Sequence, residues 1–281
     1  MRTVLTIAGS DSGAGAGIQA DLKSISANGA YGLSVLTSVT AQNTRAVTAA
    51  FALPVDLIEA QFAAVFADFS PAAAKSGMLA DRERVEAVAS AIRRYNPPHY
   101  VLDPVMVSKS GFPLLQKEAI DALRTQLLPL CEVVTPNIHE AQLLAEMPIT
   151  TLAEARIAAA RILEQGPRAV LLKGGHLEER PGTDLLLSAR GARLYEGEFI
   201  ETTSTHGTGC TFSAALATQL AHGHTLEDAV GIAKAYLTEA IRNAPGLGTG
   251  AGPTDHFFYL RNGDTASWLS KLGVTTEEPR P

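Results

Sequence analysis

The chain has 281 residues, of which 46% are hydrophobic and 19% charged, so it can bury the core of one large α/β domain or two small ones. Its formal net charge is −6 and no run of lysine and arginine occurs, which argues against a nucleic-acid-binding surface. Two cysteines are too few for a disulfide framework and lack metal-motif spacing, and no apolar stretch approaches the ~18 residues of a membrane span. These features predict a cytoplasmic protein that uses neither nucleic acid nor a membrane as partner.

Strand and helix patterns alternate along the whole chain. Short apolar, β-branched runs predict strands at residues 3–8, 33–39, 72–76, 100–102, 131–134 and 169–172, and a hairpin over 185–187 and 193–195. Helical periodicity predicts helices at 18–27, 56–68, 82–95, 117–127, 151–165 and 226–242, with further helices opening near 135–140 and after residue 209. This order predicts an α/β fold in one domain, 1–281, with a mostly parallel central sheet and helices on both faces. The tail after residue 262 is polar and predicted to be loose.

A glycine-rich loop, residues 9–17, separates the first strand from the first helix. The Walker phosphate-binding pattern ends in Gly-Lys-Ser/Thr, whereas Ile18-Gln19-Ala20 follows here. The other use of such a loop is close backbone approach to a flat ligand, with Gly9 against the ring. Asp21, one turn into the helix, either faces the same ligand or is a solvated helix carboxylate.

Two side chains near strand ends are candidates for reading a heterocycle. The amide of Gln42 offers a donor and an acceptor, which together match an amino group beside a ring nitrogen. A plain loop glutamine is the alternative. Met78 follows a short strand and is either a core side chain or the wall of a ligand site.

Charged and amide side chains follow several of the predicted strands. Asp103 and Lys173 each come directly after a buried strand, where ligands bind in open α/β sheets. Asn137 and Glu140 share a helix face and offer oxygens suited to Mg²⁺ held through water. A helix N-cap with its partner three residues on is the alternative reading of that pair.

The segment 205–211 is the strongest candidate for an anion site. Its residues are Thr205, His206, Gly207, Thr208, Gly209, Cys210 and Thr211. Its two glycines precede a small-residue helix, so backbone N–H groups and the positive end of the helix dipole favour an anion there. The same field is expected to lower the pKa of Cys210 and make its thiolate a base. The alternative is an ordinary helix start with an inert buried cysteine.

Together these parts are what phosphoryl transfer requires, because that reaction depends mostly on positioning and charge neutralisation. Two other classes remain open from the residues. One is a binding module that holds a nucleotide or vitamin without turnover. The other is a hydrolase that uses Cys210 and His206 as a nucleophile–base pair, although no third orienting residue is evident.

Motifs along nearly the whole chain resemble a known family. They are the segments 8–11, 15–21, 41–44, 75–78, 103–106, 135–140, 173–176 and 205–210, with shorter matches near 252–257. The chain resembles the ribokinase-like kinases, and within them the hydroxymethylpyrimidine/phosphomethylpyrimidine kinases of thiamine biosynthesis. Sugar-type members carry Asp where this chain has Cys210, and Ala14 departs from a glycine common in the first loop.

The resemblance implies ATP and Mg²⁺ as cofactors and two successive phosphoryl transfers, first to 4-amino-5-hydroxymethyl-2-methylpyrimidine and then to its monophosphate. It also implies a homodimer. A pyridoxal or pyridoxine kinase, possessing a similar flat substrate, is the nearest rival. The expected roles are catalysis by Lys173, Gly207, Thr208, Gly209 and Cys210; nucleotide binding by Asn137, Lys173, Thr205, His206 and Gly207; metal binding by Asp103 and Glu140; and substrate binding by Gly9, Asp21, Gln42, Met78 and Val105.

Overall fold

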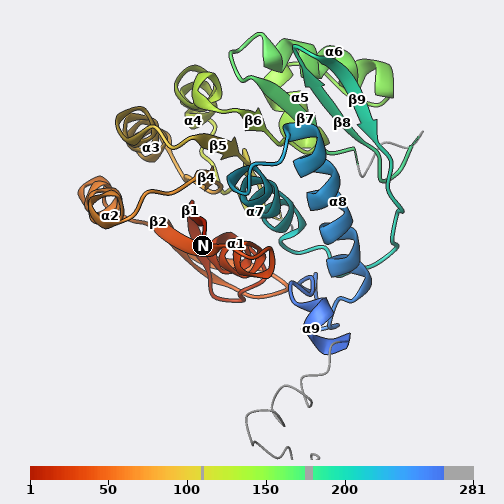
Figure 1. Ribbon diagram of the computed structural model, residues 1–281, viewed down its shortest axis with the longest axis horizontal. Coiled ribbons are helices and arrows are strands. Elements are labelled where there is room, and N and C mark those ends of the chain that lie inside the picture. The colour runs from red at the N-terminus through yellow and green to blue at the C-terminus, as the bar shows by residue number, and fades with distance from the viewer. Residues whose placement is uncertain (109–110, 175–179, 263–281) are drawn as a thin grey trace, which may run out of the picture.

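The computed structural model describes residues 1–108, 111–174 and 180–262 (Figure 1). The expected loose tail after residue 262 and the Gly175–His176 part of one motif lie outside these ranges. Among the described residues, nine strands form one sheet in the order β3-β2-β1-β4-β5-β6-β7-β8-β9. The strands are β1 (Thr3–Asp11), β2 (Tyr31–Gln42), β3 (Val47–Ala52), β4 (Ala73–Ser76), β5 (His99–Leu102), β6 (Val133–Val134), β7 (Ala169–Leu172), β8 (Asp184–Ser188) and β9 (Gly191–Tyr195).

The central six strands, from β2 to β7, pair in parallel, and β3, β8 and β9 add antiparallel edges. This confirms the predicted mostly parallel sheet. Strand β3 was not predicted, because its residues are largely exposed and show no alternation of apolar and polar side chains. Strand β1 is longer than expected: it continues through Gly9 to Asp11, past a register shift against β2.

Helices cover both faces of the sheet, as predicted (Figure 1). One face carries α1 (Gly17–Ala27), α7 (Thr208–Ala221) and α8 (Leu226–Arg242). The other carries α2 (Val55–Asp68), α3 (Arg82–Tyr95), α4 (Ala119–Ala122), α5 (Ile138–Ala145) and α6 (Leu152–Leu163). The short helix α9 (Phe258–Asn262) ends the described chain. None of the described helices is long and apolar enough to cross a membrane.

The parallel strands divide their side chains between two hydrophobic cores. In β1, Val4 belongs to the core under α7 and α8, and its neighbour Leu5 belongs to the core on the opposite face. In β5, Val101 and Leu102 are divided in the same way. This follows from the two-residue period of a strand, and it explains why the buried strands read as continuous apolar runs.

The predicted helix at 117–127 is the main local difference. There α4 passes into a π-helical turn, η1 (Leu123–Leu127), and then a 3₁₀ turn, η2 (Leu128–Leu130). Pro129 lacks the N–H that a continuing α-helix needs. With the wider turn, Leu123, Leu127 and Leu128 are all buried in the core on this face, so packing overrides the simple helical period.

Candidate active site

A cavity of about 750 Å³ lies at the edge of the sheet where the parallel strands end. It collects residues that follow β1, β4, β5, β6 and β7, together with the start of α7. The predicted site residues that line it are Gly9, Gln42, Met78, Asp103, Val105, Asn137, Glu140, Lys173, Thr205, His206, Gly207, Thr208, Gly209 and Cys210. Of the predicted set, only Asp21 is missing from this lining.

The N-terminus of α7 forms one wall of the cavity. Its N-cap is Gly207, which has a φ of 76°. A Cβ at Gly207 would lie 1.8 Å from the carbonyl oxygen of Gly15, so only glycine fits this close approach between the two loops. The N-termini of α1 and α5 reach the same cavity through Gly17 and Asn137. Three helix N-termini therefore border one cavity, and that of α7, which no side chain caps, favours an anion there.

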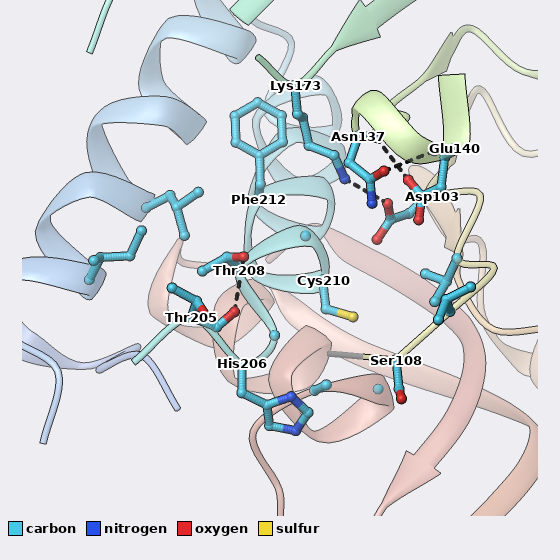
Figure 2. A pocket seen from close by; sticks show the side chains of 18 of the residues that line it. Asp103, Ser108, Asn137, Glu140, Lys173, Thr205, His206, Thr208, Cys210 and Phe212 are labelled. Atoms are coloured by element: carbon cyan, nitrogen blue, oxygen red, sulfur yellow. Dashed lines mark hydrogen bonds and ion pairs between the residues drawn. The ribbon is translucent and has the colours of Figure 1, made fainter. Parts of the chain in front are cut away.

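Lys173, which is partly buried, and buried Asp103 form an ion pair in the cavity wall, with 3.0 Å between Lys173 Nζ and Asp103 Oδ1 (Figure 2). Ser213 of α7 donates to Asp103 Oδ2 at 3.3 Å. Burial alone raises the pKa of Asp103, but the charges of Lys173 and Lys75 and the hydrogen bonds from Lys173 and Ser213 together hold the pKa below its ordinary value. The pKa of Lys173 is raised, because Asp103 and Glu140 outweigh the opposing effect of burial. Asp103 is therefore ionised and Lys173 charged.

Asn137 and Glu140 form the capping box that was the alternative reading. The Asn137 side chain accepts from the Glu140 N–H at 2.9 Å, and Glu140 Oε2 accepts from the Asn137 N–H at 2.8 Å. Burial raises the pKa of Glu140 to about 7; Lys173 opposes this shift and Asp103 adds to it. Asp103 and Glu140 are two buried carboxylates, of which Asp103 raises the pKa of Glu140, and a divalent cation would stabilise such a donor set. The capping role and the metal role are thus compatible for Glu140.

The charge state of Cys210 differs from the sequence prediction. Cys210 lies in the first turn of α7, half-buried, between the Lys173 cluster and His206 (Figure 2). Burial raises the pKa of its thiol to about 12, although Lys75 and the Gly17 N–H both act to lower it. The prediction that the helix terminus lowers this pKa was wrong, because desolvation is the larger effect. The thiol is protonated at neutral pH.

Asp21 does not reach the cavity. It is fully buried, and both of its carboxylate oxygens lie 2.9 Å from Nζ of Lys75, which is also fully buried. Thr6 donates a further hydrogen bond to it. The interpretation of Asp21 as a substrate ligand is corrected accordingly: it joins α1 to strands β1 and β4 beneath the site. The helical spacing of the sequence placed Asp21 in its turn of α1, but it could not show that Lys75, 54 residues away, is its partner.

Asp11 is a site residue that the sequence analysis missed. It accepts hydrogen bonds from the N–H groups of Gly13, Gly15 and Ala16 at 2.8, 3.0 and 2.8 Å, and so shapes the glycine-rich loop. His206 Nε2 lies 2.8 Å from Asp11 Oδ2. These contacts give His206 a carboxylate partner on the loop, rather than the arrangement that a Cys210–His206 hydrolase pair requires. An aspartate within a glycine-rich loop was the available signal.

A second missed region lies at the far end of the cavity, along α8. Lys234 Nζ contacts Asp184 Oδ2 at 2.7 Å and the Gly182 carbonyl oxygen at 2.6 Å. Apolar side chains, including Leu237 and Ile241, line this end with Phe199. An apolar slot bordered by polar groups suits a flat base. The helical periodicity of residues 226–242 is equally typical of a helix face that packs on the core, so no separate signal in the sequence indicated that this face of α8 lines a cavity.

The fold and the site together define a phosphotransferase with a ribokinase-like fold. The chain belongs to the phosphomethylpyrimidine kinase family, whose model matches residues 11–255. It is 50% identical over 257 residues to the hydroxymethylpyrimidine/phosphomethylpyrimidine kinase of Rhizobium meliloti, covering 90% of this chain and 96% of that protein.

Two further relatives show the range of the likeness. The thiamine biosynthesis bifunctional protein ThiED of Geobacter sulfurreducens is 46% identical over 254 residues. The match covers 90% of this chain but only about half (52%) of the length of ThiED. The solved structure of pyridoxal kinase from Staphylococcus aureus in complex with ADP superposes with a TM-score of 0.86 at 34% identity, covering 93% of this chain and 95% of that one. The fold is thus shared with kinases of different vitamin substrates.

Proposed function

We propose that the protein phosphorylates 4-amino-5-hydroxymethyl-2-methylpyrimidine with ATP and then phosphorylates the monophosphate to the diphosphate. The observation that carries this proposal is the N-terminus of α7 beside the Lys173–Asp103 pair, an anion site in a cavity large enough for a nucleotide and a small ring. Its support is the higher identity to pyrimidine kinases, 50%, than to the pyridoxal kinase, 34%.

The two ends of the cavity suit the two substrates. The α8 end, with Leu237 and Ile241, takes the base of ATP, and the phosphates then extend toward Gly207 and Lys173. The opposite end holds Gly9, Gln42, Met78 and Val105, where a flat ring fits against backbone and apolar side chains. The hydroxymethyl group of that ring then points to the start of α7, between the two ends.

The residues of the chain neutralise charge in both transfers. Lys173 and the N–H groups at the start of α7 stabilise the charge that develops on the transferred phosphoryl group. When Mg²⁺ is bound, it neutralises phosphate charge, and Asp103 and Glu140 are the residues placed to hold it through water. In a loose transition state the attacking alcohol keeps its proton until late, so little help from a base is needed. A protonated Cys210 thiol is therefore compatible with the first transfer, in which Cys210 acts as a positioning group. The second nucleophile is already an anion.

The proposal is tested by measuring ADP release from the purified protein with Mg-ATP and four acceptors: the hydroxymethylpyrimidine, its monophosphate, pyridoxal and ribose. Turnover with the first two is the expected result. Turnover with pyridoxal alone would show that the protein is a pyridoxal kinase. The structural likeness to pyridoxal kinase is the observation that supports this second candidate. Binding of ATP without turnover of any acceptor would support a binding module instead.

We also propose that the protein acts as a cytoplasmic homodimer. Strand β3 is an open sheet edge, and Phe51 on it is 65% exposed beside Val39, which is 44% exposed. Exposed apolar edges of this kind are normally covered. Light scattering after size exclusion should give twice the chain mass of 29.5 kDa, and Phe51→Lys should shift it toward the monomer. A monomeric wild type would contradict this.

A further inference from the structure

The amide of Gln42 is held at both of its ends and at its backbone. Ser12 Oγ lies 2.7 Å from both the N–H and the carbonyl oxygen of Gln42, which fixes the main chain. In the side chain, one amide end lies 3.2 Å from His206 Nε2 and the other lies 3.2 Å from Thr40 Oγ1. As drawn in the structure, the nitrogen lies at the His206 end and the oxygen at the Thr40 end. A held amide presents its donor and acceptor to a ligand in a fixed order.

The donors and acceptors around the amide require the opposite assignment. The Thr40 hydroxyl has a single proton. Thr40 Oγ1 donates it to the carbonyl oxygen of Ser10, which lies 3.0 Å away and can only accept. Thr40 therefore offers Gln42 a lone pair. His206 Nε2 lies 2.8 Å from Asp11 Oδ2, and a carboxylate there requires Nε2 to carry a proton. The two ends of an amide are assigned from such bonds, so the oxygen belongs at His206 and the nitrogen at Thr40.

Asp11 and His206 are built into the loop before any ligand arrives. Asp11 is 3% exposed and His206 is 7% exposed. The His206 ring packs on Gly15 so closely that a Cβ at Gly15 would lie 2.3 Å from its Cδ2. Three backbone N–H groups already hold the Asp11 carboxylate, and although burial alone raises its pKa, the hydrogen bonds of His206 and of the loop keep that pKa below its ordinary value. The Nε2–H of His206 is thus held on Asp11, and the protonated Nε2 has no lone pair with which to accept from the amide nitrogen of Gln42.

We propose that His206, oriented by Asp11, is a specificity-determining positioning residue that locks the Gln42 amide with its oxygen toward His206 and its nitrogen toward Thr40. With the exocyclic group on the His206 side of this amide, the site accepts a ring whose exocyclic group donates and whose neighbouring ring nitrogen accepts, as in a 4-aminopyrimidine. It rejects the ring with the reverse order. This inference rests on the proposed function, and it gives His206 a role at the acceptor end of the cavity rather than in nucleotide binding.

The matched probe is the pyrimidine in which a carbonyl replaces the 4-amino group and the adjacent ring nitrogen carries a proton. It differs from the proposed substrate only in donor–acceptor order. His206→Phe keeps the ring that packs on Gly15 and removes the N–H. We expect the wild type to prefer the amino compound, and His206→Phe to lower the ratio of the two kcat/KM values by about tenfold to a hundredfold. The change should lie mainly in KM for the pyrimidines, with KM for ATP little changed.

Gln42→Ala provides the control, because without the amide there is nothing for His206 to lock. In the Gln42→Ala background His206→Phe should leave the ratio of the two kcat/KM values unchanged. The difference between its effects in the two backgrounds is the coupling that a double-mutant cycle measures. Thr40→Val, which removes the lone pair at the other amide end, should lower the ratio in the same direction and serves if His206→Phe does not fold. An unchanged ratio with a raised KM for ATP would overturn the lock and support nucleotide binding by His206. Wild-type protein that turns over neither pyrimidine would overturn both the lock and the proposed function.

Discussion

Lys173 is the cation that faces both carboxylates of the cavity. Its Nζ lies 3.0 Å from Asp103, and its charge is favoured by Asp103 and Glu140 despite burial. Lys173→Met removes the charge and keeps most of the length. We expect kcat to fall by about 10²–10³-fold in both transfers, because one electrostatic donor to the transferred group is lost. Separate assays with the alcohol and the monophosphate measure the two steps.

The matched control for this change is Lys117→Met, since Lys117 is exposed and does not line the cavity. It should leave both kcat values unchanged. Lys173→Met should also lower the free energy of unfolding by about 3–5 kcal/mol, because buried Asp103 loses the cation that lies 3.0 Å away. Retention of wild-type kcat by Lys173→Met would remove Lys173 from the catalytic set.

Cys210 is the residue whose chemistry the structure changes most. A working general base contributes about 10²–10⁴-fold, and it acts only on the transfer in which an alcohol loses its proton. A thiol whose pKa is raised by burial to about 12 is not available as that base at neutral pH. We therefore expect Cys210→Ala to lower kcat of the two transfers by similar factors, measured by initial ADP release. A loss confined to the first transfer would restore the base assignment.

At the scale of elements, the contact between the glycine-rich loop and α7 depends on Gly207. Its φ is 76° and a Cβ would meet the Gly15 carbonyl, whereas Gly246 has a φ of 65° with no atom within 4 Å of its Cβ position. Gly246→Ala should cost about 1 kcal/mol from backbone strain alone. Gly207→Ala adds a clash with backbone and should cost more than about 3 kcal/mol. Urea unfolding measures both, and equal costs would contradict the close approach.

The segment after α8 is tied to α7 by a buried histidine. His256 is 4% exposed, and its Nε2 lies 3.0 Å from Thr211 Oγ1. Burial lowers the pKa of His256 to about 4 from its ordinary 6.5, and Lys23 adds to this shift. Because the unfolded chain binds the proton more tightly, this contribution to stability is present above pH 6.5 and is lost as pH falls toward 4.

We therefore expect the wild type to lose about 2 kcal/mol more than His256→Gln when the pH falls from 7.5 to 5. The glutamine variant keeps a hydrogen-bonding side chain and has no titration. Urea unfolding of both proteins at the two pH values gives the difference. Parallel pH curves would show that His256 is not the titrating group.

Elements with local signals could be predicted from the sequence. The helix at 82–95 was predicted at its observed bounds, because Asp81 caps its start and Asn96 ends it in the left-handed region. Strand β3 could not be predicted, since an exposed edge strand is defined by its pairing with β2 and not by its own pattern. The same limit applies within the site: most cavity residues follow strands and were found, whereas Asp21 and Lys234 depend on partners far along the chain.

For the whole molecule, the site joins the two helical layers that lie on opposite faces of the sheet. Glycines and N–H groups come from α1 and α7 on one face of the sheet, and the Asn137–Glu140 capping box comes from α5 on the other. Strands β1, β5 and β7 place side chains in both cores as well as ending at the cavity. A ligand at this edge therefore contacts groups from every layer.

The single-domain prediction leads to an expected calorimetric result. If residues 1–262 unfold as one unit, a saturating nucleotide should move one thermal transition as a whole, because binding to the folded state alone adds about 2.7 kcal/mol at a hundredfold excess over Kd. For a chain of this size, with an unfolding entropy of about 2.1 cal/mol/K per residue, that corresponds to a rise in Tm of roughly 5 °C. Differential scanning calorimetry with and without Mg-ATP measures the shift. Two transitions, of which nucleotide moves only one, would divide the chain into two units, whereas a single shifted peak would show that the edge of the sheet couples both cores.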